Sequence, residues 1–278
     1  MKSKAFIFVT SLLLVACWDT KNNTQQQEEE TKDSLVQTEK IIFSSSKFNT
    51  KKKILDTEIP NYKIDIDVKY AKGESEVAQL INKQLVALLF DSTIMPFEKA
   101  QEHFIDSLCN DFEKDLKENY DPDYDCQSTY QYEYSLKGEV LENTPEGIIS
   151  YSSWIQDYMG GAHGGAYSCY LNFHEATGKI VTCDELFGKS KATVCKLIKN
   201  QIVEDYECKT AAELEEKTSI FSLGEVYISN YNFAIEKESI LFCFNPYEIA
   251  PWSEGTICTR LSFKQLHGLI NLNAISNK

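Results

Sequence analysis

One histidine lies in the most glycine-rich stretch of the chain, and it is the residue best suited to chemistry. The segment Asp157–Tyr167 reads DYMGGAHGGAY and places His163 among four of the twelve glycines of this 278-residue chain. An imidazole can act as a general base or bind a metal ion. Either role needs partners. The candidates are Asp157, which could orient the ring, and His174 and Glu175 across a predicted hairpin.

The motifs that usually complete such a site are missing from the sequence. None of the patterns H-E-x-x-H, G-x-S-x-G, C-x-x-C or the phosphate-binding P-loop occurs in the chain. We therefore expect a protein that is not an enzyme, with no catalytic residue, no metal ion and no cofactor. The alternative is a domain that catalyses or assists the hydrolysis or deacetylation of peptidoglycan or polysaccharide and uses His163.

The glycines around His163 also fit two non-catalytic roles, and the sequence leaves both open. Glycine adopts positive φ angles and allows another backbone to approach closely, so the segment could be a tight turn that the imidazole ties down. Exposed backbone N–H groups beside an imidazole could equally receive a carboxylate or a sugar hydroxyl. A second segment, Asn245–Pro251, is either a stiff hairpin connection or a contact loop beside the first. The candidate ligand-loop residues are Gly160, Gly161, His163, Gly164, Tyr247 and Glu248.

The N-terminus has the features of an export signal. Two lysines precede a short apolar run, and Leu14–Cys17 reads LVAC, which resembles the lipobox of bacterial lipoproteins. We interpret residues 1–16 as a signal peptide, Cys17 as the lipidated residue, and residues 17–50 as a lipidated N-terminus and disordered tether. These features predict an extracytoplasmic protein of the bacterial cell envelope, lipid-anchored to the inner or the outer membrane. The alternative is an ordinary signal peptide that contains a cysteine.

The eight cysteines other than Cys17 form an even number, as is usual in exported chains with disulfides. Cys169 and Cys183 lie symmetrically about a predicted turn, and Cys243 and Cys258 flank a predicted loop. These four are the candidate disulfide residues, paired in that order. The remaining local pairs are Cys109–Cys126 and Cys195–Cys208. The alternative is that several thiols stay reduced and pack as small apolar side chains.

The chain is strongly acidic. Its formal net charge is −14 at pH 7, and loss of the two signal lysines leaves 26 basic against 42 acidic residues, a net charge of −16. Such a surface repels nucleic acid and anionic lipid, so we expect no nucleic-acid partner. It favours cationic partners, whose encounter it accelerates at low salt.

Apolar periodicity predicts the elements that carry these residues. Alternation over residues 62–70 predicts a strand, and apolar stripes over residues 74–90 and 97–118 predict two amphipathic helices. The second half is dominated by predicted strands, with helices at residues 191–207 and 263–270. The fold class is therefore α+β, with helices packed on an antiparallel sheet in two closely associated subdomains.

The expected folded regions are an N-terminal α+β region over residues 51–145 and a C-terminal α+β domain over residues 146–278. A row of tyrosines, Tyr130, Tyr132 and Tyr134, lies on one face of a predicted strand in the first region. This row is either a sheet face packed by aromatic side chains or a platform on which a sugar stacks.

Three ordered stretches of the second half resemble one protein family. They are Tyr158–Gly164 (YMGGAHG), Asn172–Phe187 with its TGK turn, and Asn245–Gly255 with NPYEIAP. They resemble the DUF3298 family, an extracellular domain later named after the lysozyme-sensing anti-sigma factor that carries it. The resemblance covers about residues 145–270, and residues 53–145 resemble the DUF4163 or PdaC-like companion domain, which also occurs fused to peptidoglycan deacetylases. The chain departs from the family pattern at two places, His174 and Trp252–Glu254.

This resemblance implies an envelope-facing binding or sensory domain, and it supplies no catalytic residue. The ligand that it implies is a protein such as a lysozyme, or a cell-wall glycan such as a peptidoglycan fragment. The acidic charge of the chain suits a basic protein partner. The other expected partner is the membrane, which the chain contacts through its N-terminal lipid.

Overall fold

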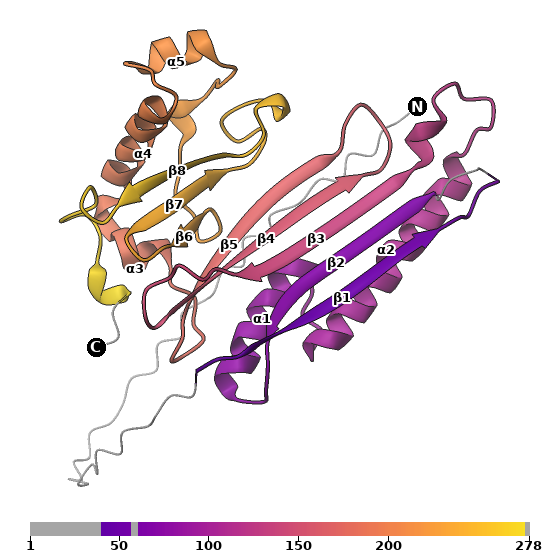
Figure 1. Ribbon diagram of the computed structural model, residues 1–278, viewed down its shortest axis with the longest axis horizontal. Helices are drawn as coiled ribbons and strands as arrows, with labels where there is room; N and C mark the ends of the chain where they lie inside the picture. The colour runs from indigo at the N-terminus through magenta and orange to yellow at the C-terminus, as the bar shows by residue number, and fades with distance from the viewer. Residues whose placement is uncertain (1–39, 57–60, 276–278) are drawn as a thin grey trace, which may run out of the picture. The chain divides into compact units, whose positions relative to one another are not determined.

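The alternating segment forms strand β2, Tyr62–Ala71, in a computed structural model that describes residues 40–56 and 61–275 (Figure 1). The apolar side chains of Tyr62, Ile64 and Ile66 are buried, whereas Lys63 and Asp65 between them are exposed. Successive side chains of a strand point to opposite faces, so this pattern assigns one face to a core and the other to solvent.

The first sheet has five strands in the order β1-β2-β3-β4-β5. The other four are β1 (Phe43–Lys52), β3 (Tyr132–Val140), β4 (Ile148–Tyr158) and β5 (Gly165–His174). All neighbours are antiparallel except β2 and β3, which are parallel, so the expected antiparallel sheet is in fact mixed. Parallel neighbours need a crossover connection, and helices α1 (Glu76–Phe90) and α2 (Phe97–Asn119) supply it.

Both crossover helices pack on one face of this sheet (Figure 1). Helix α1 begins where the Ser75 hydroxyl accepts a hydrogen bond from the Ala78 backbone N–H, which is a standard N-cap. On α2, Phe112 is fully buried and meets Tyr132 of β3 edge to face, with ring centroids 5.5 Å apart. The ring centroids of Tyr134 and Phe104 lie 5.7 Å apart in the same core. The tyrosine row is therefore core packing, and its interpretation as a sugar platform is wrong.

The second sheet has three strands in the order β6-β7-β8, all antiparallel. They are β6 (Phe233–Ile235), β7 (Ser239–Phe244) and β8 (Ile257–Ser262). The helices of this part are α3 (Cys183–Phe187), α4 (Lys191–Asp205) and α5 (Ala211–Lys217). Buried residues of α4, among them Ile198, share a core with Phe242 and Phe244 of β7.

The short helix predicted at residues 263–270 does not form, and this prediction was wrong. The segment is a series of turns, in which the Leu266 and Leu269 backbone N–H groups donate to Ser262 and Leu266. Gly268 has a φ of 76°. A positive φ is incompatible with a right-handed helix, so the apolar spacing serves core packing here without helical backbone.

Asn172 on β5 joins the two sheets through its side-chain amide. Its Nδ2 donates to the carbonyl oxygen of Phe233 at 2.9 Å, and its Oδ1 accepts from the Ile235 backbone N–H at 2.8 Å. The same Oδ1 accepts from the Ser150 hydroxyl of β4 at 2.7 Å. Asn172 has no exposed surface. A buried amide that is hydrogen-bonded through both its nitrogen and its oxygen therefore links β4, β5 and β6.

Two expected boundaries are corrected by the sheet. Strand β1 begins at Phe43, so the last residues of the expected tether are an ordered edge strand. Its polar sequence FSSSKFNTKK is typical of an edge strand, whose outward side chains face water, and for that reason it resembled a tether. The boundary expected at residue 145 falls within one sheet, because β4 pairs with β3 through eight residue pairs.

One of the two named disulfides is present. Cys243 and Cys258 face each other on β7 and β8 and form a disulfide, with Cα atoms 4.1 Å apart. The pair Cys169–Cys183 does not form, and that prediction was wrong. After the β-bridge at Ile180 the chain leaves the hairpin and enters α3, whose first residue is Cys183. The thiols of the other two local pairs are also free.

The predicted signal peptide, Cys17 and most of the tether lie outside the described residues. Within residues 40–56 and 61–275, no helix combines the length and the apolar character needed to cross a bilayer.

Candidate functional site

The glycine-rich segment is the connection between β4 and β5, and each of its glycines has a steric role. Gly160 and Gly161 have φ angles of 83° and 96°, which L-residues rarely adopt. A Cβ atom on Gly164 would overlap the carbonyl oxygen of Asp157, and one on Gly165 would overlap its carboxylate. The segment is therefore a tight turn in which the backbone returns closely against the end of β4.

His163 projects from this turn and is held by groups on both sides. Its Nδ1 lies 3.0 Å from the carbonyl oxygen of Gly164, and its Nε2 lies 3.2 Å from the hydroxyl oxygen of Tyr247. A carbonyl only accepts, so Nδ1 carries the proton, and in the neutral ring Nε2 accepts from Tyr247. The imidazole also stacks on Trp252, with ring centroids 4.4 Å apart and planes inclined by 19°.

Tyr247 lies in the second candidate segment and Trp252 directly follows it, and both side chains remain on the surface. Tyr247 is 58% exposed and Trp252 is 38% exposed. Tyr247 also has a φ of 73°, although it is not a glycine. The left-handed conformation costs such a residue about 1–2 kcal/mol. The exposed aromatic side chain of Tyr247 therefore belongs to a residue with an unfavourable backbone conformation.

Glu248 supports this segment from within. One of its carboxylate oxygens accepts from the Tyr227 hydroxyl at 2.9 Å, and the other accepts from the Asn245 backbone N–H at 2.9 Å. Burial, together with the Glu248 charge, raises the pKa of the Tyr227 phenol. The Asn245 side chain in turn binds both backbone polar groups of Ser168 on β5. Glu248 is therefore a positioning residue, since both its oxygens are already used.

The expected partners of His163 lie elsewhere. Gly165 and His174 stand at opposite ends of the ten-residue strand β5, about 30 Å apart at about 3.4 Å per residue. His174 instead lies 4.0 Å from Glu185 at the start of α3. The arrangement of His163, His174 and Glu175 as metal ligands is therefore wrong. Among the described residues, no group of three His, Cys, Asp or Glu side chains is placed to hold a metal ion.

Asp157 is engaged with the backbone of the turn. Burial raises the pKa of its carboxyl above the ordinary value, and hydrogen bonds from backbone N–H groups, including that of Gly165, oppose this rise. Its charge in turn adds to the effect of burial in raising the pKa of the Tyr167 phenol. Asp157 therefore contributes negative charge beneath the turn.

We expect Asp157→Asn to stabilise the protein at pH 7 and to leave its stability unchanged at about pH 3. Because the pKa of Asp157 is raised on folding, the folded chain holds this proton more tightly, and stability falls as pH rises through the folded pKa. The gain should be under about 1 kcal/mol, since the group is only partly buried. Urea denaturation at both pH values measures it, with Asp106→Asn on the exposed face of α2 as the control. A variant that is less stable than the parent at pH 7 would contradict this account.

Sequence reasoning identified the histidine, the glycines and Tyr247 but not the rest of the aromatic cluster. In the sequence, Trp252 was noted only as a departure from the family pattern. That departure was the signal that could have identified it as part of the site. Tyr227 is 41% exposed and contacts the Asn245–Gly255 segment through the hydrogen bond from its hydroxyl to Glu248. We call His163, Tyr227, Tyr247 and Trp252 the aromatic site.

These features define an α+β protein that presents an aromatic site on the loops of its two sheets. Its sequence places it more narrowly. Residues 55–166 match the family model described as "Deacetylase PdaC", and residues 184–264 match the model described as "Protein of unknown function (DUF3298)". The chain thus carries a PdaC-like domain followed by a DUF3298 domain. The glycine-rich turn falls in the first match, not in the DUF3298 match as expected.

Solved structures share this fold. A DUF3298 family member from Bacteroides fragilis has a TM-score of 0.74 at 21% identity, over 83% of this chain and 94% of its own. A DUF3298 family protein from Pseudomonas aeruginosa has a TM-score of 0.60 at 14% identity, over 87% of this chain and 99% of its own. No curated protein matches the chain significantly.

Proposed function

We propose that this protein is a non-catalytic binding protein of the bacterial cell envelope that captures a basic protein through the aromatic site. The observation that carries the proposal is Tyr247, a residue with positive φ whose aromatic side chain is exposed and whose hydroxyl is hydrogen-bonded to His163 of another loop. Strained backbone persists where the surrounding structure enforces it, and such positions cluster at ligand-binding sites. Tyrosine and tryptophan are the residues that most often dominate the energy of protein interfaces.

The charge of the chain supports a basic partner. The net charge of −16 that remains after loss of the two signal lysines steers a cationic protein toward the surface and accelerates its association at low salt. By family resemblance a lysozyme is such a partner. A cell-wall glycan is the other ligand that the family suggests, and the binding experiment below includes it as an outcome.

The location of the protein is part of the proposal. The lipobox-like LVAC sequence supports lipidation at Cys17, and the Cys243–Cys258 disulfide agrees with an oxidising compartment. Labelling with a radioactive or alkyne-bearing fatty acid tests this directly. Incorporation should be lost in Cys17→Ser and kept in Cys126→Ser, whose thiol is free. Equal labelling of both variants would contradict it.

We expect a cationic lysozyme to bind the protein in a salt-sensitive manner, and Tyr247→Ala and Trp252→Ala each to weaken binding by about tenfold. Biolayer interferometry at rising salt measures both effects. Tyr124→Ala is the matched control, because Tyr124 is 43% exposed and lies outside the aromatic site. A basic protein that is not a lysozyme tests whether charge alone suffices. Binding of peptidoglycan fragments but of neither protein would favour the glycan ligand.

One substitution distinguishes the enzymatic alternative from the binding proposal. His163→Ala removes the ring that stacks on Trp252 and the hydrogen bond to Tyr247. The binding proposal therefore expects this variant to bind the basic protein more weakly, and it expects neither parent nor variant to turn over a peptidoglycan substrate. If His163→Ala folds normally and abolishes turnover of a peptidoglycan substrate, the protein is a hydrolase or deacetylase.

A further inference from the structure

The face of the five-stranded sheet opposite α1 and α2 carries a row of polar side chains. Along β3 and β4 the side chains that share this face stand in four successive cross-strand pairs. They are Glu133 with Tyr158, Ser135 with Gln156, Lys137 with Trp154, and Glu139 with Ser152. Successive pairs lie two residues apart along each strand, which is about 7 Å, so the row of four pairs extends for about 20 Å.

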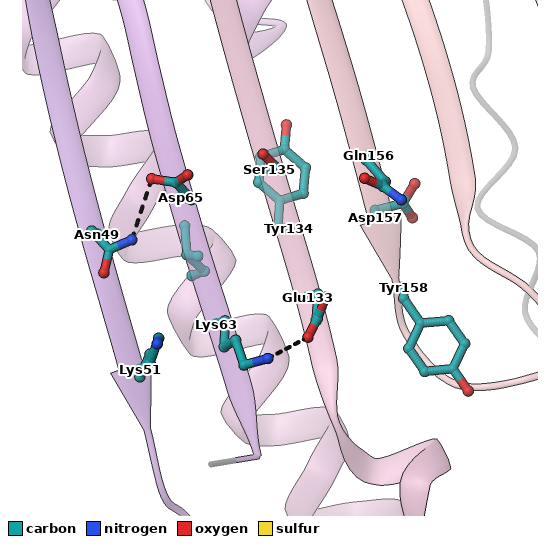
Figure 2. A pocket seen from close by; sticks show the side chains of 11 residues that line it. Asn49, Lys51, Lys63, Asp65, Glu133, Tyr134, Ser135, Gln156, Asp157 and Tyr158 are labelled. Atoms are coloured by element: carbon teal, nitrogen blue, oxygen red, sulfur yellow. Dashed lines mark hydrogen bonds and ion pairs between the residues drawn. The ribbon is translucent and has the colours of Figure 1, made fainter. Parts of the chain in front are cut away.

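Two depressions lie end to end on this row. The first, of about 250 Å³, spans β1 to β4 and is lined on this face by the first two pairs and by Asn49, Lys51, Lys63 and Asp65 (Figure 2). The second, of about 320 Å³, is lined by Lys137, Glu139, Ser152 and Trp154. We call the two together the sheet groove. Small-ligand sites begin at about 300 Å³, so the first depression lies just below this lower limit and the second just above it.

Trp154 is the unusual member of the sheet groove. It is a large aromatic side chain on a polar face, only partly buried, and the Lys137 ammonium lies 5.9 Å from its ring centroid. The face of an indole ring carries negative potential, which attracts an ammonium group and also the polarised C–H bonds on one side of a sugar ring. Trp154 therefore offers a stacking surface in the middle of the groove.

The groove also holds polar groups suited to sugar hydroxyls. Gln156 is exposed, and Ser135 lies beside it on the neighbouring strand. Figure 2 shows that the Asn49 amide donates to Asp65, at 3.2 Å, and that Lys63 pairs with Glu133, at 2.6 Å. The hydrogen bond between the Asn49 amide and the Asp65 carboxylate preorganises these two groups, which reduces the side-chain entropy that they lose when a ligand binds.

The charge of this face differs from that of the chain. By strand register it carries five lysines and four carboxylates, although the chain as a whole has a net charge of −14. Three of the carboxylates are engaged, Asp67 by Lys47, Asp65 by Asn49 and Glu133 by Lys63. The lysines with no carboxylate partner among the described residues are Lys51, Lys69 and Lys137. An anionic group on a ligand would therefore meet ammonium groups that are not paired with a carboxylate here.

We propose that the sheet groove binds a linear acidic glycan, with one sugar ring stacked on Trp154 and its carboxylates paired with Lys51 and Lys137. The site is separate from the aromatic site and does not depend on the function proposed there. The glycan lies along β3 and β4, and Ser135 and Gln156 hydrogen-bond its hydroxyl groups. The row of four cross-strand pairs is long enough to accommodate several sugar units of an extended chain.

Titration of the full chain with two oligosaccharides of equal length tests this proposal. The acidic probe is a hyaluronan tetrasaccharide, in which glucuronic acid alternates with N-acetylglucosamine, and the neutral probe is chitotetraose. We expect the acidic probe to bind about tenfold more tightly than the neutral one, and this preference to shrink between about 50 and 300 mM NaCl. Equal affinity for the two probes would overturn the proposal.

The variants locate the binding. Trp154→Ala should weaken binding of the acidic probe by about tenfold, and Lys51→Ala and Lys137→Ala each by about two- to fivefold with a reduced salt dependence. Lys99→Ala on α2 and Trp252→Ala in the aromatic site are the matched controls and should bind the probe as the parent does. Near-UV circular dichroism verifies that each variant is folded. Loss of binding in Trp252→Ala but not in Trp154→Ala would place the glycan in the aromatic site and overturn the proposal.

Discussion

Asn172→Ala is expected to lower the free energy of unfolding by about 3–5 kcal/mol. The substitution removes the amide that binds β6, so the Ile235 N–H and the Phe233 carbonyl lose their side-chain partner. Both groups lie in residues with no exposed surface, where water does not replace the lost hydrogen bonds. Each buried group left unsatisfied costs about 1–3 kcal/mol. The Ser150 hydroxyl is less affected, because it also donates to the Ile235 carbonyl oxygen.

Urea denaturation of Asn172→Ala against the parent measures this loss. Asn49→Ala is the matched control, because Asn49 is exposed and makes a single side-chain hydrogen bond, to Asp65. Such a surface change is expected to stay within about 0.5 kcal/mol. If the two asparagine variants unfold at the same urea concentration, Asn172 does not couple the sheets as the structure indicates.

Loss of the Cys243–Cys258 disulfide is expected to cost about 3 kcal/mol. The bond closes a segment with a sequence separation of 15, and a closed loop of this length restricts the unfolded chain by about that amount. The same segment carries Tyr247 and Trp252, so the disulfide ties both ends of the loop that presents them. We therefore expect Cys243→Ala/Cys258→Ala to lower stability and also to weaken binding at the aromatic site.

Denaturation in the presence and absence of a reductant checks the disulfide prediction. The reductant should destabilise the parent to the level of the double variant and should not affect the double variant itself. Cys126→Ser is the control, since that thiol is exposed and free. A parent whose unfolding midpoint is unchanged by full reduction would contradict the prediction.

Much of the secondary structure was predicted from the sequence, because it depends on consecutive residues. The strand at residues 62–70 and the helices at 74–90, 97–118 and 191–207 all exist within a few residues of the predicted bounds. The Cys243–Cys258 pairing also followed from position, because both residues flank one local hairpin. Residues 263–270 are the exception, where helical spacing of apolar residues coincided with turns.

The candidate site was predicted only in pieces. The glycine pattern indicated a tight turn, and Gly160 and Gly164 show the two reasons for it, positive φ and close approach. The contact between His163 and Tyr247 joins residues 84 positions apart, and no local pattern encodes it. Trp252 stacks on His163 from the same distant segment, so its role was invisible until the two loops were placed together.

The sequence alone determined the acidic charge, the α+β class and the resemblance to the two families, since these reside in composition, periodicity and ordered motifs. Only the tertiary structure decided that β4 and β5 complete the first sheet, that Cys169 and Cys183 stay apart, and that Trp154 faces an open groove. Local periodicity is set by neighbours along the chain. Pairing between distant segments is instead settled by which arrangement buries the most apolar surface while satisfying polar groups such as the Asn172 amide.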